Sequence, residues 1–313
     1  MRTGRCHRYF LSPVTKIIYT NNAIELMYDA DRTISIEQSA VVFQINFACE
    51  DCRLVIAPIY ANVQLSKQRR QEVSMRYELY YQPSIQGRGE FIRLALEDAG
   101  ADYIDVARDP NFGRPGIMKF LEDRSLEHPP FAPPFLKAGK LLISQTANIL
   151  QFLAPRLALV PKSEASRLWA HQLQLTIADW LYETGQTHHP IANVLYYEQQ
   201  ADEAKKRAAH FTANRIPKFL GYFEKILEQN AQGDFIFGRK VAYVDLSLFQ
   251  MIEGLRYAFP KTSARLEGQH PRIVALHDRV LARPRIAAYL SSPRRLAFNE
   301  QGIFRHYPEL EEE

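Results

Sequence analysis

Three short segments, far apart in the chain, decide the fold: Tyr77-Glu78-Leu79-Tyr80-Tyr81-Gln82-Pro83, Pro133-Pro134-Phe135-Leu136 and Ser144-Gln145-Thr146-Ala147-Asn148-Ile149-Leu150. In the first segment Tyr77, Leu79 and Tyr81 stand at alternate positions, which predicts a short strand. In the third segment Gln145 and Thr146 stand where a helix is expected to begin.

The residues between these segments predict alternating helices and strands. Phe91 and Leu94 belong to an apolar stripe that ends at Gly100, as helices often end at a glycine. A second strand is expected from Tyr103 to Val106, and a short helix from Ile117 to Leu121. The order strand-helix-strand-helix-strand-strand-helix brings the ends of the three segments to one edge of a small sheet, so we interpret them as one site.

After Pro155 the pattern changes to long helices. Between Ser166 and Gly185 the residues Trp169, Leu173 and Ile177 recur at spacings of four, which predicts a buried stripe on one helix face. Further helices are expected over residues 201–229 with a kink at Pro217, and over 241–258, 271–282 and 285–290. The second half is therefore expected to be all helical.

The composition limits the classes of function. A chain of 313 residues with 46% hydrophobic residues is long enough for two domains with buried cores. The net charge of +4 is modest, so it does not indicate the basic surface typical of nucleic-acid binding. No apolar run approaches the length of a membrane span. We therefore expect neither nucleic acid nor membrane as a partner.

Residues 1–74 stand outside this pattern. They show no helix-length periodicity, and Met75 opens the recognisable domain directly. We expect them to form a poorly ordered extension. They contain all three cysteines, two of them in Cys49-Glu50-Asp51-Cys52, but no redox or zinc-site context accompanies this pair. Because no cysteine follows residue 52, no disulfide is expected in the core, which suits a reducing compartment.

The three segments, in this order and followed by a helical half, resemble the soluble glutathione transferases. That family has a thioredoxin-like first domain, with a catalytic hydroxyl at the end of the first strand, a cis-proline before the third and a Gln-Ser or Gln-Thr pair opening the third helix. The matching residues here are Tyr81, Pro134 and Gln145-Thr146, and the resemblance covers Met75 to Leu290. It implies an α/β thioredoxin-like glutathione-binding domain over residues 75–155, followed by an all-α helical bundle domain over 163–300.

The resemblance implies that Tyr81 is the catalytic hydroxyl and donates a hydrogen bond to the glutathione thiolate. Lowering the pKa of a thiol by about two units needs about 2.7 kcal/mol. One charge-assisted hydrogen bond of about 1.5 to 3 kcal/mol, helped by a nearby cation, can supply this. Arg88 is the candidate cation. Ser84 is the alternative hydroxyl, because some transferase classes use a serine further along the same loop. From periodicity alone, Tyr81 would be a core aromatic residue and Arg88 a solvated charge.

Glutathione itself is expected beside the cis-proline and at the start of the third helix. Free N–H groups and the positive end of the helix dipole favour a carboxylate there. The resemblance assigns Gln145 and Thr146 to the γ-glutamyl carboxylate, while the ordinary alternative is helix capping with Ser144 as the cap. Pro133 and Pro134 would hold the cysteinyl backbone. Because Pro133 has no N–H, one hydrogen bond of about 0.5 to 1.5 kcal/mol would be missing.

Other charged residues are candidates for the two ends of glutathione. Lys119 or Arg124 would hold the glycyl carboxylate, and the sequence leaves this choice open. Asp179, on the polar side of the first long helix, matches a family acid that reaches the amino group of the ligand across a dimer interface. Its alternative is an ordinary solvated residue.

One helix start departs from the family. The helix after Gly238 usually begins with Ser or Thr three residues before an acid, and here Ala242 precedes Asp245. The capping box is therefore expected to be half built.

Together these inferences predict a dimeric, cytoplasmic glutathione transferase, tyrosine-using and bacterial-like, that joins glutathione to small electrophiles. Glutathione is the co-substrate, a homodimer is expected, and no metal is expected. The electrophile would lie on the helical domain near Tyr182 and Tyr257. Glutathione-dependent peroxidases, isomerases and non-catalytic binding modules share this fold and remain alternatives.

Overall fold

The computed structural model describes residues 76–230 and 233–311, together with the backbone of five strands nearer the N-terminus. The chain divides into two compact units, Met1–Glu72 and Val73–Glu313. The strands of the first unit form two antiparallel sheets. One contains β1 (Lys16–Tyr19), β2 (Ala23–Tyr28) and β3 (Arg32–Glu37). The other contains β4 (Phe43–Asn46) and β5 (Val55–Pro58). Poor order of this extension stays a prediction, and the Cys49-Cys52 pair lies outside the described residues.

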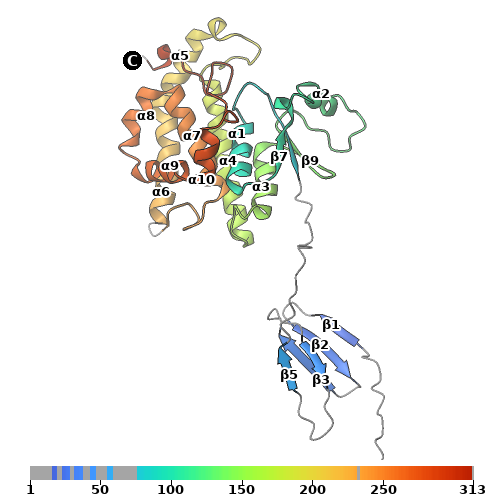
Figure 1. The fold of residues 1–313 in the computed structure, drawn as a ribbon. Helices are drawn as coiled ribbons and strands as arrows, with labels where there is room; N and C mark the ends of the chain where they lie inside the picture. Colours follow the sequence, from blue (N-terminus) through green and yellow to red (C-terminus); the bar gives the residue numbers. More distant parts are fainter. Residues whose placement is uncertain are drawn as a thin grey trace, which may run out of the picture. The chain divides into compact units, whose positions relative to one another are not determined.

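A four-stranded mixed sheet forms the centre of the first domain of the second unit (Figure 1). Its strands, in the order β7-β6-β8-β9, are β7 (Tyr103–Asp105), β6 (Tyr77–Tyr80), β8 (Phe135–Ala138) and β9 (Leu141–Ser144). Strand β6 runs parallel to β7 and antiparallel to β8. The predicted second strand is one residue shorter than expected, because Val106 begins a 3₁₀ turn.

Helices cover both faces of this sheet, and the side-chain alternation decides which residue meets which helix. Helices α1 (Gly89–Ala99) and α3 (Thr146–Arg156) cover one face, where Leu79 and Leu136 pack. The short α2 (Pro115–Leu121) covers the other face, where Tyr80 stacks on Phe135 with ring centroids 4.7 Å apart. The predictions that Gly100 ends a helix and that Tyr80 belongs to the core are confirmed.

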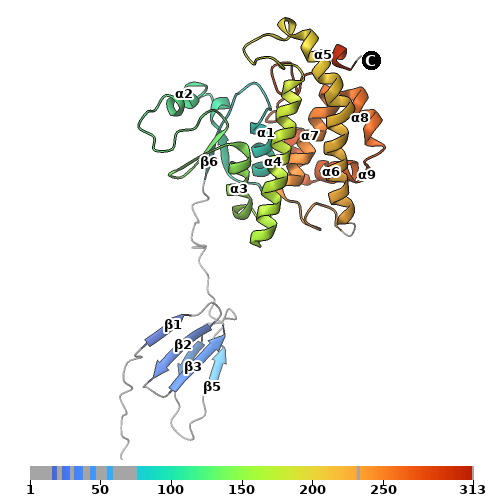
Figure 2. The same ribbon diagram turned by 180° about the vertical axis from the view of Figure 1, so that it is seen from behind.

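The second half is all helical, as predicted, with α7 at its centre (Figure 2). Its helices are α4 (Glu164–Gln186), α5 (Ala201–His210), α6 (Ile216–Gln229), α7 (Tyr243–Ala258), α8 (Pro260–Glu267), α9 (Pro271–Leu281) and α10 (Pro284–Leu290). The single helix expected over residues 201–229 is interrupted by a π-helical turn at Phe211–Arg215, because Pro217 cannot donate its backbone hydrogen bond. No helix in the described part of the chain combines the length and apolarity needed to cross a bilayer.

The caps of two helices, α3 and α7, can be compared with expectation. The alternative role of Ser144 as the cap of α3 is wrong: Ser144 ends β9, and Gln145 takes the cap position with a φ of 70° and no capping side chain. At α7, Asp245 accepts hydrogen bonds from the backbone N–H groups of Ala242 (2.7 Å) and Ile236 (2.9 Å). The carboxylate half of the capping box is therefore present and the hydroxyl half is missing, as predicted.

The chain after α10 runs back over both domains as an irregular tail, residues 291–311. Phe304 is buried against Gly254 of α7, where a Cβ atom would lie 2.3 Å from the phenyl ring. Asn299 donates from Nδ2 to the carbonyl oxygen of Ser84 at 2.9 Å, and the Gln86 amide donates to that of Leu296. The tail is thus fastened to the loop that follows β6, although the sequence resemblance ended at Leu290.

Candidate active site

Tyr81 directly follows β6, and the loop after it folds over its ring. The side chain is 5% exposed, and its hydroxyl oxygen accepts a hydrogen bond from the backbone N–H of Arg88 at 2.9 Å. A Cβ atom on Gly87 would lie 2.2 Å from this oxygen, and one on Gly89 would lie 2.5 Å from the ring carbon Cδ1. The loop can cover Tyr81 only because both positions are glycine, a role that the sequence analysis did not recognise.

A buried cation, Arg93, lies beside the Tyr81 ring. Its guanidinium carbon is 5.8 Å from the ring centroid, and the group pairs with Asp105 at 2.7 Å and with Glu90 at 3.2 Å. Sequence reasoning missed Arg93, because a charged helical residue is expected in solvent.

The environment of Tyr81 keeps its hydroxyl protonated. Burial raises the pKa of Tyr81, while the N–H of Arg88 and the charges of Arg88 and Arg93 oppose this rise without cancelling it. A neutral phenol retains a proton to donate, so Tyr81 is a hydrogen-bond donor near neutral pH.

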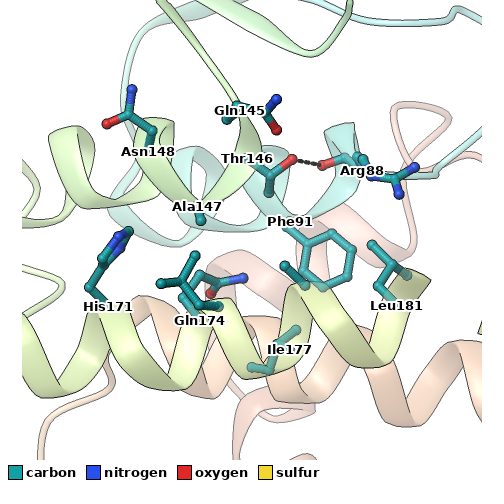
Figure 3. Close-up of a pocket in the computed structure, with 12 residues that line it drawn as sticks. Arg88, Phe91, Gln145, Thr146, Ala147, Asn148, His171, Gln174, Ile177 and Leu181 are labelled. Carbon is teal, nitrogen blue, oxygen red and sulfur yellow. Dashed lines mark hydrogen bonds between the residues drawn. The ribbon is translucent and has the colours of Figure 1, made fainter. Parts of the chain in front are cut away.

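A cavity of about 320 Å³ lies between the start of α3 and the side of α4 (Figure 3). Arg88, Gln145 and Thr146 line one side, while His171 and Gln174 of α4 line the other. The Thr146 hydroxyl donates to the carbonyl oxygen of Arg88 at 3.3 Å. The residue Arg88 therefore connects Tyr81, through its N–H, with the start of α3, through its C=O.

Two features of the cavity between α3 and α4 are of the kind that attract an anion. The first backbone N–H groups of α3 have no partner within their own helix and lie at the positive end of its dipole. Within the described part of the chain, the Arg88 guanidinium forms no ion pair.

A second cavity of about 280 Å³ contains Tyr81 and adjoins the first, because Arg88 and Leu181 line both. Its opposite wall comes from the end of α4 and from the tail, which contribute Tyr182, His188, His189, Ile303 and Arg305. Sequence reasoning found Tyr182 but missed the histidines and the tail.

The expectation that Tyr257 lies with Tyr182 is wrong. Tyr257 stacks on Phe298 with ring centroids 5.0 Å apart, and its hydroxyl donates to Glu300 at 2.6 Å. It is held by the tail and lies outside the cavity that contains Tyr81.

The other predicted residues are not gathered at these cavities. Ser84 is exposed and lines neither of them. Lys119 and Arg124 are exposed on and after α2, and Asp179 is exposed on α4. The structure therefore brings Tyr81, Arg88, Gln145 and Thr146 together at the two cavities. The four exposed residues lie elsewhere.

The bond between Pro133 and Pro134 is cis, as expected, and it immediately precedes β8. Among the described residues, no three His, Cys, Asp or Glu side chains gather as metal ligands.

Comparisons with known proteins agree with this geometry. Residues 185–293 match the family model described as glutathione S-transferase, C-terminal domain. A glutathione S-transferase of Plasmodium falciparum is 23% identical over 222 residues, which cover 68% of this chain and 94% of that protein. Glutathione S-transferase P 1 of Xenopus laevis is 25% identical over 221 residues, covering 70% and 93%. The solved Pi-class glutathione S-transferase of Onchocerca volvulus has a TM-score of 0.56 at 22% identity, covering 72% of this chain and 98% of that one.

These similarities support the soluble glutathione S-transferase family for this chain. The structural likeness shows the predicted fold, a thioredoxin-like domain followed by a helical domain. The relatives named here come from eukaryotes, so they give no support to a bacterial-like character.

Proposed function

We propose that the protein is a cytoplasmic glutathione transferase in which Tyr81 holds the thiolate of glutathione while a small electrophile occupies the second cavity. The observation that carries this proposal is the position of Tyr81, which lines the second cavity and bonds to the residue that also lines the first. Curated relatives that match most of their own length carry the name glutathione S-transferase.

The hydrogen bonds of Tyr81 support its role as donor. Its oxygen accepts from the Arg88 N–H, so its own O–H bond remains to donate to a sulfur anion. The Arg88 N–H and the nearby Arg93 guanidinium both strengthen the phenol as a donor. Together they supply the kind of interaction that the thiolate needs, about 2.7 kcal/mol for a shift of two pKa units.

The first cavity supports the binding of a glutathione carboxylate. Arg88, Gln145 and Thr146 all line this cavity, so it is bordered by a cationic residue and by the N–H donors at the N-terminus of α3. Pro133 has a carbonyl group but no N–H, so the peptide backbone of glutathione gains one contact fewer there. The charged ends of the ligand therefore carry more of its affinity. Lys119 and Arg124 stay candidates for the glycyl carboxylate on the resemblance alone.

A homodimer completes this proposal. Leu168 and Leu175 are 60% and 47% exposed on α4, and with Asp179 they recur along one side of that helix. Phe131, just before the cis-proline, is 94% exposed. A second copy of the chain would cover these apolar side chains, and only then would Asp179 come near a glutathione.

Glutathione binding by calorimetry, followed by conjugation to chlorodinitrobenzene, tests the proposal. Tyr81→Phe should still bind glutathione but lose about 10- to 100-fold in kcat/KM, equivalent to about 1.4 to 2.7 kcal/mol. Ser84→Ala is the matched control and should retain the activity. Failure to bind glutathione, or indifference to Tyr81→Phe, would identify a non-catalytic module. A reversed ranking of the two variants would assign the role to Ser84.

A further inference from the structure

Two adjacent histidines follow the end of α4 and line the cavity that contains Tyr81. His188 is 4% exposed, and its Nε2 lies 2.8 Å from the carbonyl oxygen of Ile303 in the tail. Its Nδ1 lies 2.5 Å from Nδ1 of His189, and the two rings are nearly perpendicular at 86°. The two imidazoles and the Ile303 carbonyl therefore form a continuous chain of hydrogen bonds.

The carbonyl end of this chain determines where the protons are. A carbonyl oxygen only accepts, so Nε2 of His188 must carry a proton. A neutral imidazole has one N–H, so Nδ1 of His188 is bare and must accept from Nδ1–H of His189. Since His189 is also neutral, its Nε2 is left bare. The hydrogen bond from His188 to the Ile303 carbonyl of the tail thus leaves Nε2 of His189 with a free lone pair.

Burial, more than the neighbouring charges, keeps both rings neutral. Burial, with a further contribution from Arg305, lowers the pKa of His188 to about 3 and lowers that of His189. The charged groups that line the cavity are Arg88 and Arg305, the phenols are Tyr81 and Tyr182, and no carboxylate is among the lining residues. The proton assignment requires that both imidazoles be neutral, and these lowered pKa values meet that requirement.

The proposed function does not yet name a protein group that accepts the thiol proton. Tyr81 keeps its own proton and donates it in a hydrogen bond, so it cannot take a second one. The guanidinium groups of Arg88 and Arg305 have no lone pair to offer. The remaining titratable nitrogen with a free lone pair on this cavity wall is Nε2 of His189.

We propose that His189 is the general base of this site, that its Nε2 accepts the thiol proton of glutathione, and that His188 and the Ile303 carbonyl hold it in the required tautomer. The proposal rests on the proposed transferase function. The S–H bond breaks, its electron pair stays on sulfur, and the proton forms an N–H bond on His189. The thiolate then accepts the Tyr81 hydrogen bond and attacks the electrophile carbon. The leaving group departs with its electron pair, and His189 returns the proton to solvent.

The pH profile of kcat/KM for glutathione, measured on the full chain with chlorodinitrobenzene, tests this role. His189→Ala should lose about 100-fold near pH 6.5, the low end of the range for general-base catalysis. The loss should disappear near pH 9, because the glutathione thiol then ionises in solution. Added imidazole should restore the activity in proportion to its neutral form.

Three further variants distinguish a general base at His189 from a residue that only lines the cavity. His189→Gln keeps a donor toward His188 but has no titratable nitrogen, so it should reproduce the His189→Ala profile. His188→Gln removes the tautomer control and should give a smaller loss of the same pH dependence. His210→Ala, exposed at the end of α5, is the control and should behave as the unmodified protein.

The possible failures are distinguishable. A His189→Ala loss that is independent of pH and of imidazole would overturn the base and leave His189 as part of the wall. If activity requires Tyr81 but not His189, the general-base role of His189 is wrong and the proposed transferase function stands. A protein that neither binds nor conjugates glutathione would overturn the proposed function itself.

Discussion

The two walls of the Tyr81 cavity are built in different ways. The wall with Tyr81 and Arg88 lies at the end of a strand and the start of a helix, within one small domain. The opposite wall depends on a hydrogen bond between His188 and Ile303, which are 115 residues apart, and on the docking of an irregular tail. The first wall is therefore built from local secondary structure, whereas the part of the second wall that Ile303 and Arg305 form exists only while the tail stays docked.

This difference explains what could be predicted from the sequence. Tyr81 and Tyr80 could be assigned to opposite faces because a strand alternates with a period of two. Gln145 and Thr146 could be placed at a helix start because the resemblance to the glutathione transferases puts such a pair there. Each of these residues stands next to an element of local secondary structure.

The rest could not be predicted, because it depends on pairing between distant segments. The tail has no periodicity, and its course is set by Phe304 packing on Gly254. The prediction for Tyr257 failed for the same reason, since its partners Phe298 and Glu300 belong to the tail. Arg93 was missed because its burial depends on Asp105 and Glu90, whose pairing with it only the folded sheet and helix reveal.

The largest expected effect comes from removing the anchor of the tail. Phe304→Ala should lower the free energy of unfolding by about 3 to 5 kcal/mol, because it deletes a fully buried aromatic side chain. Denaturant unfolding measures this loss, and Phe112→Ala, 53% exposed, is the control that should change it by less than about 0.5 kcal/mol. Glutathione affinity should survive while the KM for the electrophile rises. If glutathione binding and electrophile binding weakened equally, the two cavity walls would not act independently.

Acid should loosen the tail before it affects the sheet. Burial lowers the pKa of His188 to about 3 when the tail is docked, and release of the tail should return it toward the ordinary value of about 6.5. Below about pH 6.5 the free form binds a proton that the docked form does not, so docking weakens by about 1.4 kcal/mol per pH unit. Above that pH the penalty is absent.

Hydrogen exchange of residues 291–311, compared between neutral and mildly acidic pH, measures this loosening. Global unfolding is a poorer readout, because burial raises the pKa of Asp245 to about 7 and contributes a pH dependence of the opposite sign. His188→Gln should abolish the pH response of the tail. An unchanged response in that variant would show that another group controls docking.

A smaller effect is expected on the wall beside the cis-proline. Pro133→Leu supplies the missing N–H and should tighten glutathione binding by up to about 1 kcal/mol, or fivefold. Calorimetry with glutathione measures the change. A clear weakening would mean that the rigidity of Pro133, rather than its missing donor, governs this part of the site.

The smallest effect should follow from removing residues 1–74. The four-stranded sheet takes none of its strands from the first unit, so the melting temperature and the activity of the remainder should be nearly unchanged. Thermal unfolding and the conjugation assay check this. An insoluble product would show that the extension contributes to the fold.

The central claim is that the Tyr81 hydroxyl stabilises the glutathione thiolate. Titration of the ultraviolet absorbance of the bound thiolate tests it directly, in the unmodified protein and in Tyr81→Phe. We expect the midpoint to rise by about one to two pH units in the variant, a loss of about 1.4 to 2.7 kcal/mol, while glutathione remains bound. An unchanged midpoint in Tyr81→Phe, with glutathione bound, would contradict the account.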